Sequence, residues 1–166
     1  MRIGTRLAAL AIVGNMACGL VNGQLTGQPE EVRVTNQSEA VRAEKQLFAA
    51  VNEARRNRGM PPLRWNDALA AAARRHATVM AKHGAAQHGF EGEPGLSARV
   101  KQTGAHFSWL SENVTQGPGA RSIHTQFMES SKHRANILDA DMNSIGIGVV
   151  EHAGQLFAVE DFADVR

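Results

Sequence analysis

The stretch "SSKHRANILDADMNSIGIGV", residues 130–149, passes directly from a polar segment to an alternating apolar one. His133 stands beside an arginine at what the pattern predicts to be the start of a helix. Ile145, Ile147 and Val149 then alternate with glycine and serine, which is typical of a strand. The stretch is therefore either an ordinary helix-to-strand connection or one wall of a functional site, and the rest of the chain has to decide.

The strand signal continues beyond this stretch. Residues 143–162, "NSIGIGVVEHAGQLFAVEDF", predict a β-hairpin, because two alternating runs flank "EHAGQ". Helical patterns precede the hairpin, and the chain has no internal repeat. Because the helices come first and the strands last, an α+β fold is favoured over a doubly wound parallel sheet.

Two amphipathic helices are predicted upstream of the hairpin. The first begins at Ser38, a good N-cap, and ends near Gly59, before Pro61-Pro62. The second is capped by Asn66 and ends at Gly84. Both have an apolar stripe at helical spacing, so both are expected to pack on a core.

The region between the second helix and the hairpin is harder to interpret. Residues 85–119 are rich in Gly, Pro, His and Ser, and only 96–104, "LSARVKQTG", suggests a short helix. Residues 120–133 predict a further helix. His76 and His83 lie on the inner stripe of the second helix, and His76 is interpreted as a hydrogen-bonded core residue rather than a ligand.

The composition is that of one globular domain. The 166 residues are 43% hydrophobic and 20% charged, enough to build a real core. A net charge of +2 with scattered basic residues gives no support for nucleic-acid binding. The densest basic group, Arg55, Arg56 and Arg58, is interpreted as a solvated helix end. Trp65 and Trp109 are interpreted as packing residues.

The N-terminus has the pattern of a secretory signal: two arginines, an apolar run and then small residues. We predict a signal peptide over residues 1–23, a polar linker over 24–37 and a single domain over 38–166. The apolar run is short for a membrane span, so the mature chain is expected to have no transmembrane segment and to be secreted, extracellular or periplasmic. Lipid anchoring through Cys18 is the alternative. Otherwise the mature chain has no cysteine and no disulfide.

Three polar segments, around His88, Glu112 and His133, are candidates for a catalytic or binding site. Their spacing matches no compact metal motif such as H-E-x-x-H. The chain also has no phosphate-binding glycine loop and no serine-nucleophile elbow. Local pattern alone therefore assigns no reaction.

Several motifs taken in order resemble the CAP superfamily, which comprises cysteine-rich secretory proteins, antigen 5 and plant pathogenesis-related proteins. They are "VNEARRNRGMPPLRWNDALAAAARRHATVMAKHG", then His88, "SENV", "HRANIL", "IGIGV" and "FAVEDF". The resemblance covers residues 40–163 and is to the bacterial, disulfide-free branch. It implies a three-layer α-β-α sandwich with a central antiparallel sheet, and a cleft that carries two histidines and two acidic residues.

The resemblance also implies which residues form this cleft. By motif, His88 is the first histidine, Glu112 the first acid and His133 the second histidine. The position of the second acid is occupied by Ser130, and Glu129 comes one residue too early. One residue on a helix turns a side chain by about 100°. The chain therefore departs from the family pattern at the fourth cleft position.

Such a set of residues has a definite metal chemistry. Two neutral imidazoles, His88 and His133, would hold a divalent ion such as Zn²⁺, with water completing its coordination. Because one acid is missing, we expect weak binding that fades as the histidines protonate below about pH 6.5. Glu112 would alternatively hydrogen-bond a histidine and fix its tautomer. The competing interpretation is a buried polar network without metal, and Arg134 and Asn136 are expected to secure the loop.

Three functions remain open at this point. The first, which we favour, is a secreted non-catalytic module that binds a lipid, peptide, glycan or protein ligand. The second is a metal-dependent hydrolase of peptide or polysaccharide, in which Glu112 would be the general base. The third is an envelope scaffold with an inert cleft. The loss of an acid at Ser130 counts against the hydrolase.

Overall fold

The computed structural model describes residues 28–165, with side chains from Gln37 onward. Five helices and a four-stranded sheet make up this described part. The helices are α1 (Gln28–Arg56), α2 (Asp67–His83), α3 (Leu96–Lys101), α4 (Ala120–Glu129) and α5 (Ser131–Ile137). The strands are β1 (Arg64–Trp65), β2 (Phe107–Gly117), β3 (Ser144–His152) and β4 (Gln155–Val165).

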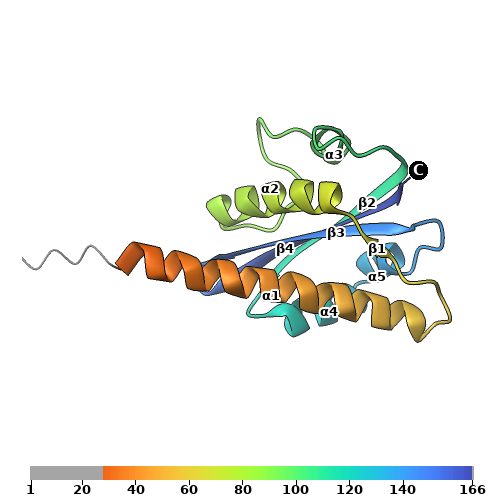
Figure 1. Cartoon of the computed structure of the whole chain (residues 1–166), viewed down its shortest axis with the longest axis horizontal. Helices are drawn as coiled ribbons and strands as arrows, with labels where there is room; N and C mark the ends of the chain where they lie inside the picture. Colours follow the sequence, from red (N-terminus) through yellow and green to blue (C-terminus); the bar gives the residue numbers. More distant parts are fainter. Residues whose placement is uncertain (1–27, 166) are drawn as a thin grey trace, which may run out of the picture.

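The sheet lies between two helical layers. Its strand order is β1-β3-β4-β2, so that β1 and β2 form opposite edges. Helices α2 and α3 cover one face, and α1, α4 and α5 cover the other (Figure 1). Apart from the two-residue β1, which pairs in parallel with β3, the sheet is antiparallel. The predicted α+β, three-layer architecture is therefore confirmed.

The opening stretch explains how the two layers fit around β3. Ile147 and its neighbours Ile145 and Val149 point into the large apolar core on the α1 face. Gly146 and Gly148 point towards α2, where a Cβ on either would overlap the helix backbone. Glycine therefore lets α2 approach the sheet at backbone contact.

Local signals placed two elements correctly. Asn66 caps α2 by accepting a hydrogen bond from the amide of Leu69 at 3.0 Å, and Gly84 ends the helix in the left-handed conformation. The predicted hairpin forms from β3 and β4, joined by a tight turn at Ala153 and Gly154. In both cases the deciding residues lie next to each other in the chain.

The start of the first helix was predicted wrongly. Helix α1 begins at Gln28, so Ser38 lies inside it, and the part of the predicted linker from residue 28 to residue 37 is helical. The N-terminal part of α1 projects past the sheet (Figure 1). A helix that is docked further along needs no apolar stripe to continue, because each added residue gains a backbone hydrogen bond. The predicted signal peptide and residues 24–27 lie outside the described residues.

The strand β2 and the break between α4 and α5 were not predicted. Glu112, Asn113 and Val114 are buried consecutively within β2, so the strand has no alternating pattern there. The helical signal over 120–133 divides at Ser130, whose extended backbone ends α4 and caps α5. None of the described helices is both long and apolar enough to cross a membrane.

Two interpretations of side chains need correction. Arg55 is not solvated: it is 1% exposed and donates hydrogen bonds to the carbonyls of Pro61, Ile137 and Asp139. It therefore fastens α1 to the turn after α5. Trp109 is 61% exposed on β2 and does not pack in the core.

Trp65, by contrast, is a packing residue as predicted. Trp65 packs edge-to-face on Phe48, with ring centroids 5.4 Å apart. His106 and His152 are exposed, whereas His124 is half-buried between α1 and α4.

Candidate functional site

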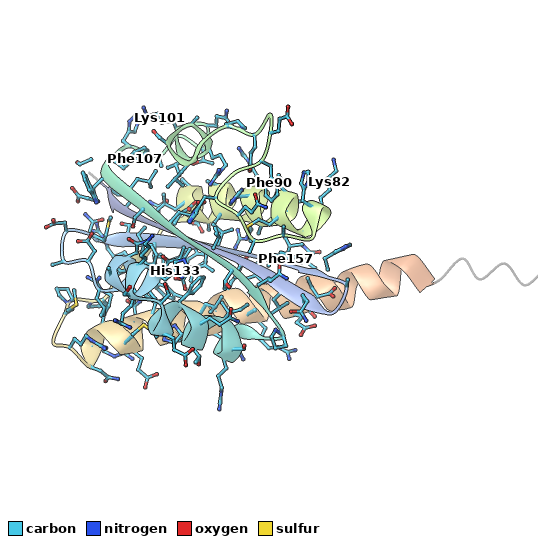
Figure 2. All side chains as sticks on the ribbon, turned by 180° about the vertical axis from the view of Figure 1, so that it is seen from behind. Lys82, Phe90, Lys101, Phe107, His133 and Phe157 are labelled. Atoms are coloured by element: carbon cyan, nitrogen blue, oxygen red, sulfur yellow. The ribbon has the colours of Figure 1, made fainter. Side chains whose placement is uncertain are left out.

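The three candidate residues come from three different elements around the edge strand β2. His88 lies on the loop after α2, Glu112 lies on β2 itself, and His133 is in the first turn of α5. In Figure 2 the strand β2 runs between the α3 layer and α5, where His133 is labelled. The edge of the sheet thus brings together residues from both helical layers.

The first pair is a direct hydrogen bond. Nδ1 of His88 lies 2.8 Å from Oε1 of Glu112. The side chain of Glu112 is 3% exposed, whereas that of His88 is 63% exposed. An ionised carboxylate only accepts hydrogen bonds, so it selects the tautomer that has the proton on Nδ1. The lone pair of His88 is then on Nε2, the nitrogen that Glu112 does not bind.

The second oxygen of Glu112 is also engaged. Nη2 of Arg99 donates to Oε2 of Glu112 in a close, buried ion pair. Nη1 of the same guanidinium donates to the carbonyls of His88 and Pro94, both at 3.2 Å. Arg99 therefore holds the carboxylate and the loop that carries His88 in one fixed arrangement. Nothing in the local pattern around Arg99 indicated this role.

A further carboxyl group lies across the sheet from Glu112. Asp161 of β4 is the cross-strand partner of Glu112, and both its oxygens are buried without a hydrogen bond. Burial, reinforced by the charge of Glu112, raises the pKa of Asp161 well above its usual range, although Arg99 opposes this. The protonated form of Asp161 is therefore favoured more than in a solvent-exposed aspartate.

His76 is a structural residue, as the sequence suggested. Its ring is fully buried, with Nδ1 2.7 Å from Oε1 of Glu93 and Nε2 2.8 Å from the carbonyl of Gln87. Both ring nitrogens are therefore occupied, and neither is available to a metal ion. His83, at the end of the same helix, is exposed and stacks on Phe90 with ring centroids 4.4 Å apart.

His133 differs from His88 in having no fixed partner for its ring. The ring packs edge-to-face on Phe127 at 5.2 Å between centroids, and it makes no hydrogen bond to another residue of the described part. Burial lowers the pKa of His133, and the charge of His88 lowers it further. His133 is therefore harder to protonate than a solvent-exposed histidine.

A network of amides positions the helix that carries His133. Asn113 of β2 donates to the carbonyl of His133 and to Oε2 of Glu160, both at 3.1 Å. Asn136 donates to Oδ1 of Asn113 at 2.8 Å, and Arg134 donates to the carbonyl of Met128 at 2.7 Å. The prediction that Asn136 and Arg134 secure this segment is confirmed.

Beneath this network lies a second buried acid. Glu160 is fully buried, and its Oε1 has no hydrogen-bond partner. Burial raises the pKa of Glu160 to about 8, opposed by the hydrogen bond from Asn113. Glu160 and Asp161 are adjacent in β4, so they point to opposite faces of the sheet.

Ser130 occupies the position where the family pattern has an acidic residue, and its role there is structural. Its hydroxyl caps α5 by accepting a hydrogen bond from the amide of His133 at 3.5 Å. Glu129 is exposed and does not replace the missing acid. In the part of the chain that the structure describes, no three His, Cys, Asp or Glu residues are arranged to hold a metal ion.

The comparison with protein families agrees with this fold. The model of the CAP family, described as the cysteine-rich secretory protein family, matches residues 48–162. This is well over half of the chain, so the protein belongs to the CAP family. The search of curated proteins gives no match.

Solved structures with the same fold come from several bacteria. An extracellular protein of Bacillus anthracis that contains an SCP domain has a TM-score of 0.71 at 22% identity, over 86% of this chain and 45% of that one. An outer surface protein of Borrelia burgdorferi has a TM-score of 0.69 at 17% identity, over 75% and 94%. A cysteine-rich secretory protein of Staphylococcus aureus has a TM-score of 0.62 at 20% identity, over 76% and 40%. The chain thus spans less than half of the Bacillus and Staphylococcus proteins, and these likenesses establish the fold.

Proposed function

We propose that this CAP protein is an exported, non-catalytic binding module, and that His88 and His133 beside Glu112 form a weak site for a divalent metal ion. The observation that carries the proposal is the hydrogen bond between Nδ1 of His88 and Glu112. It leaves the lone pair on Nε2 of His88 free of the carboxylate, and the ring of His133 likewise makes no hydrogen bond within the described residues. Export is supported by the signal-like N-terminus and by the description of two structural neighbours as extracellular or outer-surface proteins.

The residues present fit a metal ion only in part. Tightly held zinc has three or four protein ligands, usually in tetrahedral geometry. Here two imidazoles are available, and Ser130 does not supply a carboxylate. Water would have to fill the remaining positions, so affinity for Zn²⁺ should be low and reversible. The metal would supply positive charge and an exchangeable coordination position for a ligand.

The hydrolase alternative is weakened by the contacts of Glu112. A general base needs a free carboxylate oxygen within hydrogen-bond reach of the attacking water. One oxygen of Glu112 faces His88 and the other faces Arg99. Glu112 is therefore better suited to orienting His88 than to removing a proton. A binding role, with a lipid, peptide, glycan or protein as the ligand, agrees better with this arrangement.

The test is isothermal titration of the purified protein with zinc at neutral pH. We expect weak binding by the wild type, loss of binding in His88→Ala/His133→Ala, and weakening in each single variant. The control is His152→Ala, which removes an exposed histidine at the far end of β3. Wild-type affinity in the double variant would overturn the assignment of the metal site.

The choice between binding and hydrolysis needs a second measurement. A panel of peptide, ester and glycan substrates should show no turnover by the wild type with zinc present. Turnover that disappears in Glu112→Gln, while the variant stays folded by circular dichroism, would favour the hydrolase and contradict our proposal.

A further inference from the structure

A separate groove lies at the opposite edge of the sheet from His88 and His133. It has a volume of about 300 Å³, and its lining residues come from α1, β1 and α2. They are Val41, Glu44, Lys45, Phe48, Trp65 and Arg74. Because β1 and β2 are the two edges of the sheet, this groove is remote from the candidate metal site.

One wall of the groove is apolar and held in place. Phe48 and Trp65 pack edge-to-face, with an angle of 81° between their rings. The indole nitrogen of Trp65 donates to Oδ1 of Asp67 at 2.9 Å, which fixes the orientation of the ring. Val41 extends this wall and is 42% exposed, one of two exposed large apolar side chains among the residues with described side chains. The wall is therefore a preformed surface for an apolar group.

The charged side of the groove is lined by two basic residues and one acidic residue. Arg74 makes two hydrogen bonds to the buried Glu44, at 2.8 and 2.6 Å. Oε1 of Glu44 also accepts a hydrogen bond from the amide of Val149, so this carboxylate is fully engaged. Lys45 is exposed and makes no hydrogen bond or ion pair with another residue in the described range. Among the lining residues, one acid and two bases leave a net charge of +1, while Asp67, which holds Trp65, adds a negative charge near Arg74 and leaves Lys45 as the cation without a partner in the described range.

We propose that this groove binds a small aromatic carboxylate. The aromatic ring would pack against Phe48 and Trp65, and the carboxylate would pair with Lys45 and with Arg74, which Glu44 holds in position. A volume of about 300 Å³ is at the lower end of the range for small-molecule sites, which suits a single ring with a short acidic side chain. Charge-assisted hydrogen bonds give such a ligand its preference over a neutral one.

The proposal is tested by nuclear magnetic resonance on the full chain, using the indole N–H signals of the two tryptophans. Three probes share one ring and differ in charge: 3-phenylpropionate, 3-phenylpropan-1-ol and 3-phenylpropylamine. We expect the carboxylate to shift the Trp65 signal and to bind about 10-fold more tightly than the alcohol, because one charge-assisted hydrogen bond contributes about this much. The amine should bind weakest, and the exposed Trp109 should not respond.

Two variants locate the charge that is responsible. Lys45→Gln should weaken binding of 3-phenylpropionate several-fold without loss of fold, since Lys45 is exposed. Lys132→Gln, which removes an exposed lysine on α5, is the matched control and should leave the affinity unchanged. Equal affinity for the carboxylate and the alcohol, an unchanged affinity in Lys45→Gln, or no response of Trp65 to any probe would each overturn the proposal. The zinc titration above does not bear on this result.

Discussion

The two faces of the sheet are built on different principles. On the α1, α4 and α5 face, large apolar side chains such as Leu47, Phe127 and Phe162 form one continuous core. On the α2 and α3 face, smaller apolar clusters surround a buried charged group that includes Arg99 and Glu112. The first face is held by side-chain packing, and the second by close backbone approach and ion pairing.

This difference determines how each face tolerates change. Where side chains fill the gap between helix and sheet, they can repack around a lost methyl group. Where helix backbone touches strand backbone, no space exists for even one added carbon. Where charges are buried together, each depends on its partner for compensation. The α2 face, which also carries His88 and Glu112, should therefore be the less tolerant one.

The largest effect is expected from Gly146→Ala on the α2 face. Its Cβ would overlap the backbone nitrogen of Ala70, which a side-chain rotation cannot relieve. We expect a loss of more than about 3 kcal/mol in the free energy of unfolding, or no folded protein. Urea unfolding followed by circular dichroism measures it.

Two substitutions serve as comparisons for Gly146→Ala. Ile147→Val, on the opposite face of the same strand, should cost about 1 kcal/mol. Gly95→Ala, where no atom lies within 4 Å of an added Cβ, should cost about 1 kcal/mol or less. Similar losses in all three would show that the two faces do not differ in the way described.

The next effect concerns the buried charges. Arg99→Met leaves Glu112 and Asp161 buried together without their cation, so we expect a loss of about 3 kcal/mol in stability. Adding Glu112→Gln to this variant should recover part of the loss. Chemical unfolding at neutral pH gives both values. Arg56→Met, at an exposed position, is the control, and a loss in Arg99→Met no greater than the control would contradict this role.

A smaller effect is expected at Glu160, where substitution should increase the free energy of unfolding. Because its pKa is raised to about 8, the folded state holds a proton that the unfolded chain releases above about pH 4.5. Stability should therefore fall as the pH rises from about 4.5 to 8 and level off above that. Glu160→Gln removes the ionisable group, and with it this loss of stability, and keeps an acceptor for Asn113. The substitution should therefore stabilise the protein at pH 7 by roughly 1–3 kcal/mol.

The measurement is the free energy of unfolding of both proteins across pH 4 to 9. Asp161, whose pKa is also raised, contributes to the slope in the same direction. The slope should therefore decrease in Glu160→Gln and decrease again when Asp161→Asn is added. A wild-type slope that is unchanged by Glu160→Gln would mean that Glu160 is ionised in the folded protein.

The smallest effect distinguishes the two histidines. Nuclear magnetic resonance titration should give His133 a pKa below 6.5, because burial and the charge of His88 both disfavour its protonation. His88→Gln should raise that pKa without restoring it fully, since burial is the larger cause. A pKa for His133 that does not respond to His88→Gln would mean that the two rings do not share one site.

Local elements were predictable where their signals are short-range. Asn66 and Gly84 define α2 because a cap needs only the backbone a few residues away. Alternation in β3 and β4 predicted the hairpin for the same reason. Strand β2 was not predicted, because polar residues such as Glu112 and Asn113 are buried consecutively. A strand that is buried on both faces has no alternation of polar and apolar residues by which it could be recognised.

The candidate site was only partly predictable. His88, Glu112 and His133 were found through the resemblance to the CAP family, and their spacing in the chain carried no signal of its own. Arg99 and Asp161 were missed, since an isolated arginine or aspartate looks like a surface residue until its partner is known. Arg55 was wrongly interpreted as solvated for the same reason, as its acceptors lie up to 87 residues away in the chain.

By itself the sequence determined the α+β class, the ends of α2, the hairpin and the family, because these depend on periodicity, caps and ordered motifs. Only the tertiary structure decided which charges are buried together, which tautomer Glu112 selects for His88, and how closely α2 approaches Gly146. These outcomes depend on distances between residues that are remote in the chain, where desolvation and pairing set the energies.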